Sequence, residues 1–174
     1  MISLILGQGV LADSFEIDAE ALSHAREAAK ELAPEDLKEI ILHPSMANCM
    51  ERLVSEAKKH DRKGRGLESA VWVIKADDNT YSCHFWEEEL RVPGGFDWDG
   101  YLPSQTIFSI HTHPKKSGGP RPSESDFEFN KGLGIIGVIL SFNRKMLSVN
   151  YPGEKSYPTI IKSKTFRSEF KEYY

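Results

Sequence analysis

Two histidines one residue apart, His111 and His113, constrain the fold of this 174-residue chain more than any other feature. They follow the apolar residues Ile107, Phe108 and Ile110, a pattern typical of the end of a β-strand. Side chains two apart on a strand point to the same face and lie about 6.6 Å apart along it. Where a strand twists or ends, two imidazoles at that spacing can converge on one ion with bonds of about 2.0–2.1 Å. The sequence therefore predicts a strand that presents both rings to a single metal ion.

A carboxylate follows this pair after a Gly- and Pro-containing loop, in the run Ser123-Glu124-Ser125-Asp126. Two histidines and one carboxylate, with a fourth position open to water, form the ligand set of a hydrolytic zinc site. Ser-x-x-Asp is also a plain helix-capping pattern, with Ser123 as the N-cap and Asp126 in the first turn. The two interpretations are compatible, because a cap would hold Asp126 in a short turn and so orient it as a ligand.

In this order and spacing, the residues resemble the signature of the JAMM (MPN-plus, JAB domain) zinc metalloproteases. That signature is an upstream Glu, then His-x-His-Pro, then Ser-x-x-Asp, and here it is matched by His111-Thr112-His113-Pro114 and by Ser123 to Asp126. The resemblance extends from Glu68 to about Leu147. The intervening loop, residues 115–122, is longer than in most members, and its Gly and Pro residues accommodate an extension at little cost.

The resemblance implies zinc-dependent hydrolysis of isopeptide or peptide bonds in a protein substrate, such as a ubiquitin-like modifier or its conjugate. His111, His113 and Asp126 would hold Zn²⁺, Glu68 would be the general base, and Ser123 would donate a hydrogen bond to the developing oxyanion. Two alternatives remain open. The chain is a toxin or effector domain of a larger system, or it is a catalytically inactive MPN-type scaffold.

The assignment of the general base depends on where the carboxylates fall. Glu68 lies near the start of an apolar run, residues 67–74, that predicts a buried strand. A buried carboxylate is costly there unless it has an interaction partner or a functional role. The rival candidates Glu87, Glu88 and Glu89 form an acidic run after a second expected strand, residues 80–86, and such runs usually face solvent. Glu68 is therefore the preferred base.

The expected fold class is α/β, with a JAB/MPN-like (cytidine-deaminase-like) mixed sheet flanked by helices. Helices over residues 45–60 and 123–131 are expected on opposite sides of the sheet, and Gly132 is the expected C-cap of the second. Residues 1–44 are expected to form an N-terminal helical extension, and residues 45–174 the metalloprotease-like domain. Further strands are expected at residues 1–11, 135–140, 146–151 and, at an edge, 157–162.

Composition excludes several other classes. A net charge of −4 and an isoelectric point near 5.9 disfavour nucleic-acid binding. The sequence has no apolar run of membrane-spanning length and no basic start of a signal peptide, which favours a cytoplasmic location or export without a cleaved signal. Two cysteines, Cys49 and Cys83, are too few for a disulfide framework and are expected as reduced thiols. The oligomeric state is left open.

Two surface features have alternative interpretations. The aromatic residues Phe96, Trp98 and Tyr101 fall in an expected Gly-rich loop from residue 91 to residue 105, where they line a substrate groove or anchor the loop to the core. The basic residues Lys115, Lys116 and Arg121 meet an acidic partner or are ordinary solubilising charges.

Overall fold

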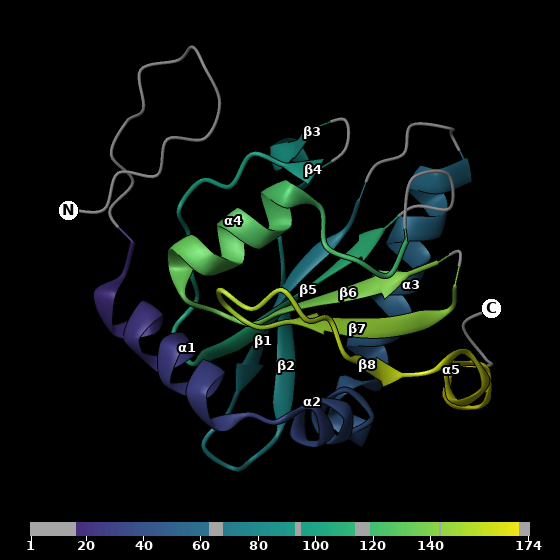
Figure 1. Ribbon diagram of the computed structural model, residues 1–174, viewed down its shortest axis with the longest axis horizontal. Coiled ribbons are helices and arrows are strands. Elements are labelled where there is room, and N and C mark those ends of the chain that lie inside the picture. The colour runs from purple at the N-terminus through teal and green to yellow at the C-terminus, as the bar shows by residue number, and fades with distance from the viewer. Residues whose placement is uncertain (1–16, 63–67, 93–94, 114–118, 143, 171–174) are drawn as a thin grey trace.

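A six-stranded mixed sheet organises the molecule, with the strand order β2-β1-β5-β6-β7-β8 (Figure 1). The computed structural model describes residues 17–62, 68–92, 95–113, 119–142 and 144–170. Within the sheet, β5 and β6 run parallel, whereas the other neighbouring pairs run antiparallel. The predicted α/β class with a mixed sheet between helices is confirmed at this level. The strand expected over residues 1–11 lies outside the described residues.

The strands of this sheet are β1 (Ala70–Lys75), β2 (Tyr81–Phe85), β5 (Thr106–His113), β6 (Gly137–Ser141), β7 (Met146–Asn150) and β8 (Thr159–Ile161). A separate two-stranded hairpin is formed by β3 (Arg91–Val92) and β4 (Gly95–Phe96). The helices are α1 (Ala19–Glu31), α2 (Pro34–Ile41), α3 (Ala47–Arg62), α4 (Glu124–Leu133) and α5 (Ser163–Glu169), with short 3₁₀ turns η1 (Pro44–Met46) and η2 (Glu88–Leu90). In the described ranges, none of these helices combines the length and apolar character that crossing a membrane requires.

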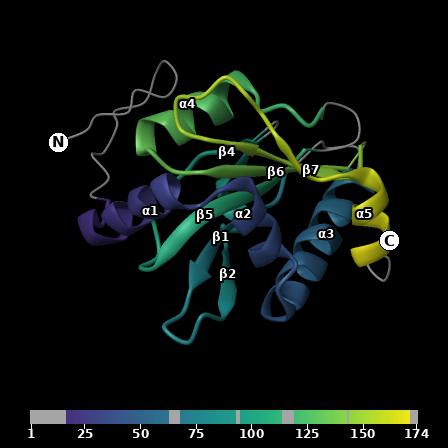
Figure 2. The ribbon, with the colours of Figure 1, turned by 60° about the horizontal axis from the view of Figure 1, so that its bottom comes forward.

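One face of the sheet is covered by α2, α3 and α5. Val71 of β1 aligns with Ile110 of β5, which aligns with Val138 of β6, and all three side chains are fully buried. They join the larger apolar core with Leu53 of α3 and Phe166 of α5. In Figure 2, α4 lies above β6 and β7, whereas α2 and α3 lie below them. The helices predicted near residues 45–60 and 123–131 therefore flank the sheet on opposite sides, as expected.

The other face carries α4 and a second, aromatic-rich core. Trp72 of β1 is 1% exposed and packs with Leu133 of α4 and Leu22 of α1. Arg26 Nε of α1 donates to the Leu133 carbonyl over 2.7 Å, so α1 is fastened to the end of α4. Both α1 and α2 thus contribute to the cores, and the predicted boundary between residues 44 and 45 stays a prediction.

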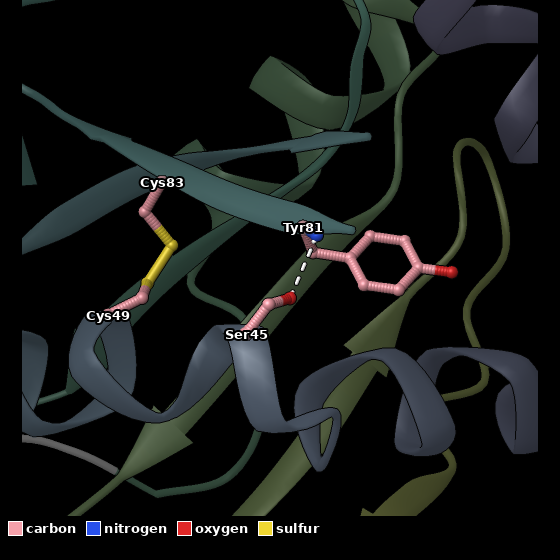
Figure 3. Close-up of a disulfide and its surroundings, with 4 residues drawn as sticks. All are labelled: Ser45, Cys49, Tyr81 and Cys83. Carbon is pink, nitrogen blue, oxygen red and sulfur yellow. Dashed lines mark hydrogen bonds between the residues drawn. A yellow bond between two sulfur atoms is a disulfide. The ribbon is translucent and has the colours of Figure 1, made fainter. Parts of the chain in front are cut away.

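The expectation of two reduced thiols is wrong. Cys49 of α3 and Cys83 of β2 form a disulfide whose Cα atoms are 5.9 Å apart (Figure 3). The Tyr81 backbone N–H donates to Ser45 Oγ over 2.9 Å beside it, so β2 is tied twice to the start of the helical segment. Cysteine spacing could not predict this pair, because α3 and β2 meet only after the chain has folded.

Three local boundaries differ from expectation. The C-cap of α4 is Gly134 and not Gly132, because Gly134 takes the left-handed conformation (φ 75°) that terminates a helix. The segment expected as a loop over residues 91–105 contains the β3–β4 hairpin. The tail after Lys162, where no element was predicted, forms the short helix α5, which Phe166 anchors in the core.

Candidate metal centre

The two histidines occupy the carboxyl end of a strand that is buried along its whole length. Every residue of β5 is buried, and His111 and His113, which were predicted to share one face, do so at its carboxyl end. Their Nε2 atoms lie 3.1 Å apart. As whole residues, His111 and His113 are 9% and 7% exposed. The strand therefore presents both nitrogens to one point, as the alternation of side chains requires.

Asp126 joins this pair from the first turn of α4. Its Oδ1 lies 3.3 Å from His111 Nε2, and its Oδ2 lies 3.2 Å from His113 Nε2. The parallel connection from β5 to β6 runs through α4, which brings the start of the helix over the end of β5. The three side chains predicted as metal ligands are thus in contact.

These spacings can be compared with those of a bound ion. For bonds of about 2.0–2.1 Å in a tetrahedron, ligand atoms are about 3.3–3.4 Å apart. The separations of 3.1, 3.2 and 3.3 Å between the two ring nitrogens and the carboxylate oxygens approach that value. Each ring nitrogen meets a different Asp126 oxygen, so the three side chains could bind one small ion once the carboxylate turns to bring a single oxygen near both rings.

Glu68 is held against the same histidines. The Ser69 N–H donates to Thr112 Oγ1, and the Thr112 N–H donates to the Ser69 carbonyl, each over 2.9 Å. This pairing places Glu68, immediately before β1, beside the end of β5. Ligand atoms of Glu68, His111 and His113 all lie within 4.8 Å of one another, so the three form a group that could hold a metal ion.

The rival carboxylates do not share this position. Glu87, Glu88 and Glu89 are exposed, and Glu88 lies 3.9 Å from Lys59 Nζ of α3. They lie in or directly before η2, beyond the end of β2, and among the described residues none of them belongs to the group of ligand atoms that could hold a metal ion. Within the described residues, the carboxylates next to the two rings are those of Glu68 and Asp126.

Electrostatics differentiate these two carboxylates. Burial raises the pKa of the Glu68 carboxyl above its ordinary value, and the charges of His111 and His113 oppose this only in part. Burial acts in the same direction on Asp126, but the charge of His111 and hydrogen bonds from His111, His113 and Ser123 hold its pKa well below the usual range. Although burial alone would lower the pKa of His111, Asp126 and Glu68 raise it to about 9. Asp126 is therefore a fixed anion, whereas Glu68 is the carboxylate suited to accept a proton.

Ser123 has the capping role that the sequence allowed. Its Oγ accepts from the Asp126 N–H over 3.2 Å, and Asp126 Oδ2 accepts from the Ser123 N–H over 2.7 Å. Ser123 Oγ also lies 2.6 Å from Asp126 Oδ2. This capping box orients the Asp126 carboxylate toward the histidines. A role of Ser123 toward an oxyanion stays a prediction.

One residue of the site was missed by sequence reasoning. His113 Nδ1 lies 3.0 Å from the Gly119 carbonyl oxygen, which only an N–H at Nδ1 can satisfy, leaving Nε2 free to bind an ion. Ser148 Oγ of β7 donates to the adjacent Pro120 carbonyl and so fixes this segment. No side-chain pattern could reveal Gly119, because its contribution is a backbone oxygen.

Described residues line hollows of different character. One of about 440 Å³ is lined by Arg121 and Lys155 together with Tyr157. Lys115 and Lys116, which were grouped with Arg121 in the sequence, lie outside the described residues. The other hollow, of about 280 Å³, is lined by aromatic residues that include Trp98 and Tyr101. Trp98 also packs on Phe129, and both side chains are partly buried against the second core, so this residue anchors the segment. A substrate groove stays a prediction.

Comparison with protein-family models, with curated proteins and with solved structures finds no significant match to this chain.

Proposed function

We propose that the chain is a zinc-dependent isopeptidase or peptidase of the JAMM type, acting on a protein substrate such as a ubiquitin-like modifier or its conjugate. The observation that carries the proposal is the convergence of His111, His113 and Asp126 at spacings close to a tetrahedral edge, with Glu68 beside them. A JAB/MPN-like fold is proposed with it. The support is a mixed sheet in which the β5–β6 crossover helix carries the carboxylate ligand.

In this proposal a zinc ion held by the three side chains would supply Lewis acidity, which makes water nucleophilic near neutral pH. Glu68 accepts a proton from the attacking water and returns it to the leaving nitrogen of the scissile bond. In the metal-free site burial raises the pKa of Glu68, which moves it toward the range in which a general base is most effective. Asp126 remains ionised, and the Gly119 carbonyl keeps the proton of His113 at Nδ1.

The first experiment measures zinc per chain by elemental analysis of the purified protein. About one zinc is expected in the wild type and none in Asp126→Ala, because that variant lacks one of the three ligands. Glu128→Ala is the matched control, since this exposed carboxylate of the same helix contacts Lys131 and not the histidines. Absence of zinc from the wild type, even after zinc is added and the excess removed, would sink the proposal and favour a scaffold.

The second experiment separates the two carboxylates. Glu68→Gln should keep its zinc and lose about 10²–10⁴ in rate on a fluorogenic peptide whose Gly-Gly tail is linked to a lysine ε-amine. Glu89→Gln, an exposed acidic residue of η2, should leave the rate unchanged. Loss of zinc from Glu68→Gln, with retention by Asp126→Ala, would reverse the two assigned roles.

A further inference from the structure

A pocket with aromatic walls and acidic edges lies on the same sheet face as the histidine pair. It has a volume of about 280 Å³ and is lined by Trp86, Trp98 and Tyr101 together with His84, Glu87 and Asp99. Trp72 forms part of the lining and is fully buried beneath these residues. The volume is near the lower limit for ligand sites, which suits one inserted side chain better than a large cofactor.

The strand register places this pocket near the metal centre. Ala70 of β1 pairs with His111 of β5, and the Trp86 N–H donates to the Ala70 carbonyl over 3.0 Å. Trp86 is thus two strands from His111, or about 10 Å at the usual strand spacing. A single extended polypeptide can reach both places.

The chemistry of the lining selects a cation. Tyr101 is a large aromatic side chain that is 55% exposed, and its ring lies 5.1 Å from that of His84. Trp86 contacts Trp72, Phe96 and Phe129, with ring centroids 4.9, 5.2 and 5.7 Å apart, so its indole is held rigidly. Aromatic faces attract cations, and Glu87 and Asp99 add negative charge, whereas none of the lining residues in the described part of the chain is a lysine or arginine.

Two of the lining tryptophans differ in their hydrogen bonds. Trp98 Nε1 donates to the Tyr101 carbonyl over 2.9 Å, which ties two lining residues together. The Trp86 indole N–H is buried and has no hydrogen-bond partner within the described part of the chain, which is costly for the fold.

We propose that this pocket binds a lysine or arginine side chain presented by a polypeptide partner. The binding requires no hydrolysis, so it goes beyond the proposed function and can hold even if that function fails. The cation lies against the aromatic rings, the carboxylates of Glu87 and Asp99 neutralise it, and the partner's backbone lies toward the metal centre.

The test follows the indole N–H signals of the full-length protein by NMR, with and without a metal chelator. All three tryptophans of the chain line the pocket, so each signal reports on it. A capped Gly-Lys-Gly peptide and its arginine analogue should shift these signals saturably. The matched Gly-norleucine-Gly peptide, which keeps the alkyl chain without the charge, and the glutamate peptide should not.

Variants test the lining residues. Tyr101→Ala and Asp99→Asn should each weaken binding about three- to tenfold. Both should fold, since the Tyr101 ring is largely exposed and an Asn at position 99 can still accept from the Tyr101 N–H. Glu35→Gln, a charge change on α2 across the sheet, is the control and should bind as the wild type does. Equal binding of the lysine and norleucine peptides, or no shift with any basic peptide in a folded sample, would overturn the proposal.

Discussion

His111 should make the stability of the metal-free protein depend on pH. Its pKa is raised from 6.5 to about 9 by Asp126 and Glu68, against the effect of burial. A histidine whose pKa is higher in the folded than in the unfolded state stabilises the fold. The full stabilisation is present at pH values below the pKa of the unfolded state, and it is lost as the pH rises through the pKa of the folded state. In chelator, the free energy of unfolding should therefore fall by about 2–3 kcal/mol between pH 6.5 and 9.

Urea unfolding across that window measures the effect. His111→Gln should show a flat profile, because its side chain does not titrate. The zinc-loaded wild type should also lose the slope, since a ring bound to metal holds no proton at Nε2. A wild-type stability that rises across the window would contradict the assignment of the ion pair.

Ser123→Ala tests two roles of one hydroxyl. Loss of the N-cap of α4 should lower the free energy of unfolding by about 1 kcal/mol. If Ser123 also donates to an oxyanion, the rate should fall roughly 10²–10³-fold with zinc content unchanged. Zinc analysis, thermal unfolding and peptide hydrolysis of one preparation separate the two effects. A destabilised variant with full activity would leave Ser123 as a cap alone.

Side-chain patterns predicted the residues of the centre because each obeys a local rule. His111 and His113 follow the two-residue period of a strand, and Asp126 follows the spacing of a helix cap. Glu68 was placed by its position at the mouth of a buried strand. The Gly119 carbonyl obeys no such rule, since any residue has one and only the folded loop selects it.

At the scale of elements, the position of α4 depends on Gly137 at the start of β6. A Cβ atom added there would lie 2.8 Å from Asn130 Cγ of α4, which is closer than packed carbon atoms allow. Gly137→Ala should therefore displace α4, lower the free energy of unfolding by about 1–3 kcal/mol and weaken zinc binding, because Asp126 is on the same helix.

Gly95→Ala is the matched control, since a Cβ at that position in β4 meets nothing within 4 Å. Zinc titration and thermal unfolding of both variants provide the comparison. Unchanged zinc affinity in a destabilised Gly137→Ala protein would show that zinc binding by Asp126 does not depend on how closely α4 packs on the sheet.

Helices and strands could be predicted where burial of one face gives the sequence a regular spacing of apolar residues. The apolar runs of β5, β6 and β7 are buried and were found. The two-residue strands of the β3–β4 hairpin are too short for any period, and the C-cap of α4 depends on which glycine adopts a positive φ. Those features arise from tertiary contacts that a local window does not contain.

At the scale of the whole molecule, the disulfide stabilises the folded protein because it restricts the conformations of the unfolded chain. It joins Cys49 and Cys83 across a separation of 34 residues. Closing a loop of that length restricts the unfolded state by about 3–4 kcal/mol. Dithiothreitol should lower the wild-type free energy of unfolding by about that amount and leave a Cys49→Ala, Cys83→Ala variant unaffected. An equal response of both proteins would show that the bond does not form.

Such a bond persists in oxidising surroundings and is rare where thiols are kept reduced. The disulfide therefore conflicts with the predicted cytoplasmic location, where the two cysteines would be kept reduced. The location stays a prediction. Titration of free thiols in protein taken from its native compartment measures which state is present there.

The Cys49–Cys83 disulfide also restrains β2 at the edge of the sheet. β2 is an edge strand, and an edge strand presents unpaired backbone groups to other chains. For two copies to exchange β2, the strand must leave the helix packed behind it, and the covalent link between Cys49 and Cys83 forbids that separation. In the oxidised protein β2 is therefore retained by its own protomer. Reduction removes that restraint. The redox state of the Cys49–Cys83 pair therefore decides whether two copies can exchange β2 and form a swapped dimer.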